Sequence, residues 1–172
     1  MQGGRISVGF LGAAQLDRYG SINTTVIGDY RYPKVRLPGA GGASEIATSC
    51  GRVFATMKHT PQGMVNKVDF VTSFGFGPEG RTRGELGILT LGPVLVITDL
   101  CLLEPEPGTN ELVVTSLHAG VTRELVSAKT GWPVRFAATL AETEPPTDNE
   151  LSVLRELHRR TEQAHQSERG DP

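Results

Sequence analysis

Short apolar runs separated by glycine-rich turns constrain the fold of this sequence more than any other feature. The first run, residues 5–15, is apolar almost throughout, which is typical of a strand buried on both faces of a parallel sheet. Further strands are predicted within residues 22–28, 51–59, 68–75, 94–98 and 112–115, which are rich in β-branched residues. The 21 glycines follow no short repeat, so a fibrous protein is excluded and tight turns are expected.

Three helices are expected among these strands. Residues 44–50 predict a short one, and Thr122 and Gly131 are placed as the N-cap and the stop of a second. Thr147 has capping-box spacing to Glu150, ahead of a leucine stripe that predicts a helix to about residue 165. Strands mixed with a few helices indicate an α/β fold, with one domain over residues 1–166 and a disordered tail at 167–172.

Length and charge restrict the class of protein. The 172 residues are enough for one core, and the net charge of -2 gives no sequence-wide basic field for nucleic acid or a membrane surface. No apolar run reaches the roughly 20 residues that span a bilayer, and no signal peptide opens the chain, so a cytoplasmic location is expected. Cys50 and Cys101 lack CxxC spacing, which favours two reduced thiols over a metal or redox site.

Residues 39–42, Gly39-Ala40-Gly41-Gly42, form the first candidate site. No Gly-Lys-Ser/Thr follows, which excludes a P-loop, and Ser44 stands where a dinucleotide fingerprint needs its third glycine. Consecutive glycines ahead of a helix can offer backbone N–H groups to an anion, or to an oxygen that becomes anionic during a reaction. A tight turn that needs positive φ is the alternative, with about equal weight.

Gln15 and Asn23 flank a turn predicted at residues 17–20. Amides beside a turn most often satisfy local backbone groups, and the alternative is that both face a ligand as donors. The other polar candidates are weaker. We expect His118 to cap or pack, and we do not expect Glu45, Glu104 or Glu106 to be a catalytic base. Arg81 and Arg83 are expected to be solvated, although either could meet a phosphate.

Two stretches together, GAAQLDRYGSINTT (12–25) and RLPGAGGASEIA (36–47), resemble the β subunits of class I coenzyme A transferases. Similar segments, among them GPVLVITDLCLLEPE, VTSLHAGVTRE and TGWPVRFA, extend the resemblance over nearly the whole chain. The resemblance implies a three-layer α/β sandwich with a mostly parallel sheet, of which this chain lacks the N-terminal portion. It also implies a partner α subunit in a heterodimer or heterotetramer, and a coenzyme A (CoA) thioester as substrate without metal or other cofactor.

The reaction implied by the resemblance is a ping-pong transfer of CoA between succinyl-CoA and 3-oxoadipate, or a similar oxo or dicarboxylic acid. A glutamate attacks the thioester to give an acyl anhydride, and CoA thiolate then attacks the anhydride to give a glutamyl thioester. That glutamate belongs to a motif ahead of the part that matches GGRISVGF, so no catalytic residue is assigned. The chain alone is therefore expected to lack transferase activity. It is also expected to be poorly soluble or oligomeric, because an opened sheet exposes strand edges and apolar faces.

In the family, the glycine loop approaches the thioester and the pantetheine arm, which places Gly39, Ala40, Gly41 and Gly42 in the CoA site. Gln15 and Asn23 match polar positions near the same cleft. Two alternatives remain open: an acyl-CoA thioester hydrolase on the same fold, and a noncatalytic CoA-binding chain.

Overall fold

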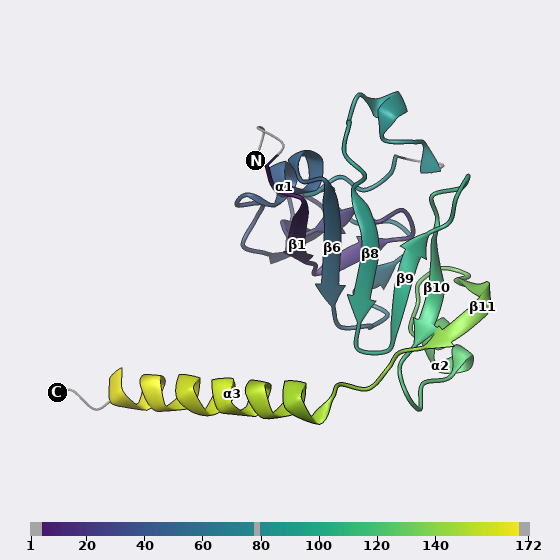
Figure 1. The fold of residues 1–172 in the computed structure, drawn as a ribbon. Helices are drawn as coiled ribbons and strands as arrows, with labels where there is room; N and C mark the ends of the chain where they lie inside the picture. Colours follow the sequence, from purple (N-terminus) through teal and green to yellow (C-terminus); the bar gives the residue numbers. More distant parts are fainter. Residues whose placement is uncertain (1–4, 78–79, 169–172) are drawn as a thin grey trace.

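The computed structural model describes residues 5–77 and 80–168, and its central element is a six-stranded mixed sheet (Figure 1). The order across the sheet is β1 (Val8–Gly12), β6 (Arg52–Met57), β8 (Pro93–Thr98), β9 (Cys101–Pro105), β10 (Leu112–Leu117) and β11 (Arg135–Glu142). Every neighbouring pair is parallel except the two pairs that β9 makes. The expected α/β class with a mostly parallel sheet is confirmed.

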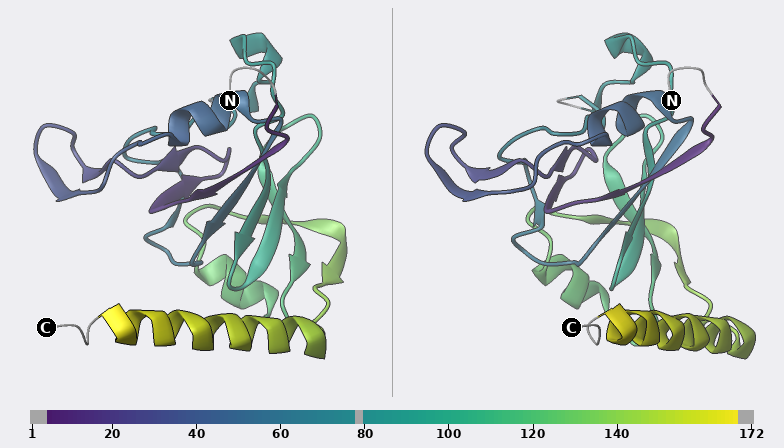
Figure 2. Two further views of the ribbon diagram at one scale, coloured as in Figure 1. Left: turned by 60° about the vertical axis from the view of Figure 1, so that its left-hand side comes forward. Right: turned by 90° about the vertical axis from the view of Figure 1, so that its left-hand side faces the viewer.

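Two small sheets and three helices complete the described chain. One sheet has the order β3 (Ile22–Asn23), β2 (Gln15–Asp17), β7 (Met64–Val65), and the other is the hairpin of β4 (Val26–Gly28) and β5 (Pro33–Arg36). The helices are α1 (Ala43–Ser49), α2 (Arg123–Ala128) and α3 (Asp148–Glu168), and Gly84–Leu86 forms one 3₁₀ turn. The β4–β5 hairpin and α3 both project from the body of the molecule (Figure 2).

The hydrophobic core lies on one face of the large sheet. Residues of the small sheet and helices, such as Leu16, Met64 and Val126, pack with sheet residues such as Val53 and Val96. Figure 1 shows the small sheets, α1 and α2 behind the large sheet and α3 below it. The described residues therefore supply two layers, the sheet and the elements on its inner face, whereas the resemblance implies three.

The outer face of the sheet is apolar at its β1 edge. Phe10 is 64% exposed and makes an edge-to-face contact with Phe54, with ring centroids 5.3 Å apart. The prediction that the first strand is buried on both faces is therefore wrong for β1, because residues alternate along it between the core and this outer face.

The remaining strand predictions had mixed outcomes. The strands expected within 51–59, 94–98 and 112–115 are confirmed as β6, β8 and β10. Residues 22–28 instead divide into β3 and β4, which belong to different sheets, and 68–75 form no strand beyond one bridge between Ser73 and Ile22. Strands β9 and β11 were not predicted, because neither has the β-branched alternation that marks the others.

The helix predictions are confirmed at their starts. The Thr122 side chain accepts from the N–H of Leu125, and Thr147 forms the predicted reciprocal capping box with Glu150. Helix α2 ends at Ala128, before Gly131, and α3 continues to Glu168; residues 169–172 of the predicted disordered tail lie outside the described residues. None of the helices described here combines the length and hydropathy that crossing a membrane requires.

Candidate functional site

The glycine loop, residues 39–42, joins β5 to α1. The Gly39 N–H donates to the Thr24 carbonyl oxygen at 2.9 Å, and the Thr24 hydroxyl donates to the Gly39 carbonyl at 2.9 Å. Within the loop, the Ala40 carbonyl accepts from the N–H of Ala43 at 2.8 Å. The φ angles are +99° at Gly39 and +49° at Gly41, a left-handed backbone that glycine adopts without strain. The need for positive φ is therefore confirmed at these two positions.

The N–H groups that follow the turn are unused. Across the described residues, none of the N–H groups of Gly41, Gly42, Ser44 and Glu45 meets a hydrogen-bond acceptor, and the N-cap residue Gly42 offers no side-chain cap. A Cβ added at Gly39, Gly41 or Gly42 would meet no atom within 4 Å. The absence of side chains at these glycines thus relieves no crowding among the described residues, and the donors without acceptors lie on exposed residues.

Gln15 and Asn23 are opposite each other in the β2–β3 ladder. Asn23, fully buried, donates to the Gln15 side-chain oxygen at 2.8 Å and to the Val26 carbonyl at 2.6 Å. Its own oxygen accepts from the N–H groups of Thr25 and Val26, which fills the capacity of the amide. Gln15 donates to the Asp69 carboxylate at 3.1 Å. Asn23 satisfies local backbone groups, as amides beside turns most often do, whereas Gln15 bonds to Asp69 from a distant segment and to the Asn23 side chain.

Three threonines that the sequence reasoning missed connect these amides to the glycine loop. The Thr72 hydroxyl oxygen accepts from the Thr24 N–H at 2.9 Å and lies 2.6 Å from the Thr25 hydroxyl. Thr24 then holds Gly39 on its other side. The pair Thr24-Thr25 was interpreted only as strand sequence, and no pattern in the sequence places Thr72 beside it. Asn23 is therefore connected to the glycine loop through Thr24 and Thr25, the two residues that follow it in the chain.

His118 and the cysteines belong to buried structural contacts. The His118 ring lies 2.8 Å from the Thr98 carbonyl and 2.8 Å from the Thr143 hydroxyl, which ties three segments together. Cys50 and Cys101 are buried free thiols, and burial raises the pKa of Cys101 to about 11. In the part of the chain described, no three or more His, Cys, Asp or Glu side chains gather into a possible metal site.

Arg83 is a structural cation, so the expectation that it is solvated and free to meet a phosphate is wrong. It is only 4% exposed, and its guanidinium donates to the carbonyl oxygens of Thr90, Phe74, Gly75 and Ala47. Burial lowers its pKa. The planar fork of arginine can serve several carbonyl oxygens at once, which explains why it joins α1 to two loops. The neighbouring Arg81 is exposed, as expected.

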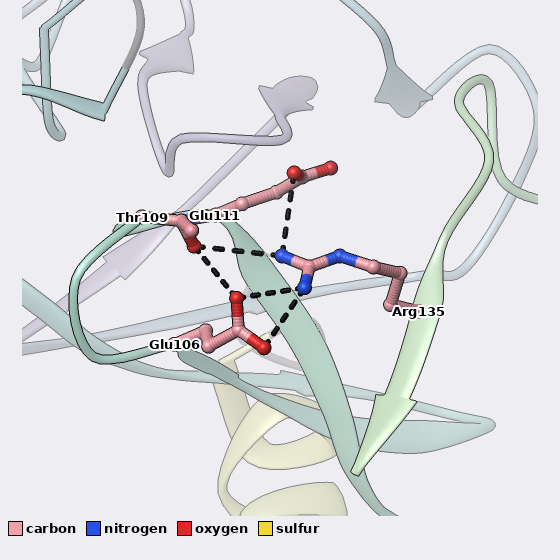
Figure 3. A network of polar contacts seen from close by, with 4 residues as sticks. All are labelled: Glu106, Thr109, Glu111 and Arg135. Atoms are coloured by element: carbon pink, nitrogen blue, oxygen red, sulfur yellow. Dashed lines mark hydrogen bonds and ion pairs between the residues drawn. The ribbon is translucent and has the colours of Figure 1, made fainter.

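Glu106 takes part in a surface network (Figure 3). Arg135 donates to Glu106 at 2.8 Å and lies 3.4 Å from the Glu111 carboxylate, while the Thr109 hydroxyl donates to Glu106 at 2.9 Å. The bond from Arg135 is the largest cause that lowers the pKa of Glu106. A carboxylate held ionised by a salt bridge is a poor general base, which agrees with the expectation from the sequence.

Known proteins share the sequence and the fold of this chain. Residues 1–129 match the family described as coenzyme A transferase. The chain belongs to the coenzyme A transferase family. It is 57% identical, over 99% of its length and 66% of the relative, to the β subunit of the 3-oxoadipate CoA-transferase of Pseudomonas knackmussii. It is 37% identical, over 87% of its length and 56% of the relative, to the β subunit of the glutaconate CoA-transferase of Acidaminococcus fermentans.

The fold of this CoA-transferase chain is also that of solved structures. The crystal structure of the glutaconate CoA-transferase of Acidaminococcus fermentans superposes with a TM-score of 0.78 at 36% identity, covering 87% of this chain and 57% of that one. A cholesterol ring-cleaving hydrolase subunit of Rhodococcus jostii is 28% identical over 86% of this chain and 57% of its own length. The chain thus spans between about half and two thirds of the length of these relatives.

Proposed function

We propose that this chain is the β subunit of a CoA-transferase that moves CoA between succinyl-CoA and 3-oxoadipate, or a similar oxo or dicarboxylic acid. The observation that carries the proposal is the 57% identity, over 99% of the chain, to the β subunit of a relative named 3-oxoadipate CoA-transferase. The enzyme works as a heteromer with an α subunit and passes through a glutamyl-CoA thioester. We assign no catalytic nucleophile among the residues of this chain, and no metal or other cofactor takes part.

The glycine loop gives this proposal its mechanism. The carbonyl oxygen of a thioester gains negative charge as its carbon is attacked, and preorganised N–H groups stabilise that charge. Gly41 and Gly42 are exposed, and their N–H groups meet no acceptor among the described residues. Loss of one such donor costs about 3–4 kcal/mol of barrier stabilisation in comparable sites. Gly39 and Ala40 form the turn that presents these donors, and the space in front of them admits the pantetheine arm.

Gln15 and Asn23 take a positioning role in this proposal. Their amides are satisfied by Val26, Thr25 and Asp69, so they hold the segment that bonds to the loop instead of touching the thioester. This role follows from the hydrogen bonds that saturate Asn23.

The test replaces Gly41 with valine in the assembled enzyme and measures CoA transfer from succinyl-CoA to 3-oxoadipate. Gly120→Val is the matched control, because Gly120 also has positive φ (+76°) and open space around its Cα. Both variants place a side chain at a residue with positive φ, which costs about 1–2 kcal/mol. We expect at least a hundredfold loss of kcat/KM for Gly41→Val and near wild-type rates for the control. Equal rates in the two variants would refute the loop's role.

A second experiment separates transfer from hydrolysis, which the similarity to the Rhodococcus hydrolase subunit keeps as a candidate. The assembled enzyme is incubated with succinyl-CoA and no acceptor acid. A transferase releases succinate and holds CoA as the glutamyl thioester until an acceptor acid arrives, so free CoA should stay near zero. Rapid continuous release of CoA would favour the hydrolase.

A further inference from the structure

The β4–β5 hairpin, residues 26–36, carries exposed aromatic rings at its tip. Tyr32 is 84% exposed and Tyr30 is 56% exposed. No ring or cation of the described residues contacts the Tyr32 ring, which leaves both of its faces open. The hairpin projects from the molecule (Figure 2). Large aromatic side chains gathered at such a tip are typical of a binding site.

The same hairpin is electropositive, although the chain as a whole has a net charge of -2. Arg31, Lys34 and Arg36 are exposed, and none of them forms an ion pair with a residue that the structure describes. The two carboxylates nearby have other partners: Asp29 accepts from backbone N–H groups of the tip, and Asp69 accepts from Gly28 and from a side-chain amide. These neutral donors leave both carboxylates charged, but the three cations outnumber them, so the hairpin region has a net positive charge that attracts an anion.

The hairpin is ordered and continuous with the glycine loop. The Tyr30 ring stacks on Phe70 with centroids 5.3 Å apart, and the Arg36 guanidinium lies 5.1 Å from the Tyr30 ring and donates to its carbonyl oxygen at 3.1 Å. Past the hairpin, the Leu37 N–H donates to the Thr25 carbonyl at 3.0 Å. The two features are thus held in a fixed relation, and little ordering accompanies binding.

We propose that this hairpin binds the adenosine 3′-phosphate 5′-diphosphate end of CoA, an inference that rests on the proposed function. Tyr32 is the stacking platform for adenine, and Arg31, Lys34 and Arg36 bind the phosphates. Seven residues separate Tyr32 from Gly39, so the two lie within about 23 Å of each other at 3.3 Å per residue. A pantetheine arm can bridge a separation of that order, so a thioester at the glycine loop can have its nucleotide at the hairpin.

The test measures dissociation constants of this chain mixed with its α subunit for CoA, dephospho-CoA and pantetheine by isothermal titration calorimetry. Tyr32→Ala should weaken CoA binding about tenfold, whereas Tyr32→Phe keeps the ring and should bind like wild type. Arg31→Gln with Lys34→Gln should weaken CoA about tenfold or more and leave pantetheine unchanged. The same double variant should reduce the dependence of CoA binding on salt. Arg155→Gln, on the exposed face of α3, is the charge control.

The outcomes separate this inference from the proposed function. If wild type prefers CoA to pantetheine and the hairpin variants keep that preference, the nucleotide binds elsewhere and only the hairpin inference fails. If the variants lose association with the α subunit but keep their CoA affinity, the hairpin is a protein interface and the inference also fails. If wild type binds none of the three compounds, both the inference and the proposed CoA site are overturned.

Discussion

Replacement of Asn23 by aspartate tests whether this buried amide holds the glycine loop. The substitution keeps the oxygen that accepts from Thr25 and Val26, and it replaces the donor NH₂ group with a second oxygen. Two donated bonds are lost, to Gln15 at 2.8 Å and to the Val26 carbonyl at 2.6 Å, and both acceptors then face an oxygen. A buried group left unsatisfied costs about 1–3 kcal/mol, so we expect a loss of about 2–4 kcal/mol in the free energy of unfolding.

The pH dependence of that loss gives a sharper test. Burial and two facing acceptors favour the neutral form of the introduced carboxyl, so its folded pKa lies above its unfolded value of about 3.9. The penalty is therefore full above the folded pKa, and it shrinks as the pH falls toward the unfolded pKa, because the protonated carboxyl can donate again.

Urea unfolding at pH 7 and pH 4.5 measures both effects, and hydrogen exchange at the Gly39 amide reports on the loop itself. The control is Asn66→Asp, because Asn66 is exposed and its side chain makes no hydrogen bond with another described residue. We expect faster exchange at Gly39 only in the Asn23 variant. Equal stabilities of the two variants, or a penalty that does not change with pH, would refute the reasoning.

Three further predictions concern the buried polar groups. Arg83→Lys should lower the free energy of unfolding by about 2–4 kcal/mol in urea titrations. An ammonium group cannot bond at once to the carbonyl oxygens of two loops and α1, which Arg83 does. Arg81→Lys is the control and should have no effect. Burial lowers the pKa of His59 to about 4, below its unfolded value, so its contribution is full above about pH 6.5 and about 3 kcal/mol is lost as the pH falls to 4. His59→Gln should flatten this loss in urea titrations across pH and His158→Gln should leave it. Both thiols are buried, and the pKa of Cys101 is raised to about 11. A disulfide reagent at pH 8 should therefore label neither cysteine until urea unfolds the chain. Labelling of the folded chain within seconds would contradict this prediction.

Local sequence patterns determined the elements whose structure depends on near neighbours. The capping box of Thr147 and Glu150 and the N-cap at Thr122 were predicted because those bonds join residues three positions apart. The positive φ of Gly39 and Gly41 follows from the loop's own glycines. The paired motifs at 12–25 and 36–47 identified the family, because both recur with their order and spacing.

Only the tertiary structure decided which polar side chains meet and which faces are covered. The segment RTRGE predicts a solvated charge at Arg83, yet this side chain is buried against Ala47 and Phe74, which are distant along the chain. Residues 68–75 have strand composition, but Asp69 and Thr72 use their side chains to hold the segments at 15 and 24–28, and the backbone forms no ladder. Propensity records local backbone preference, whereas burial and hydrogen-bond partners arise from contacts between segments far apart in sequence.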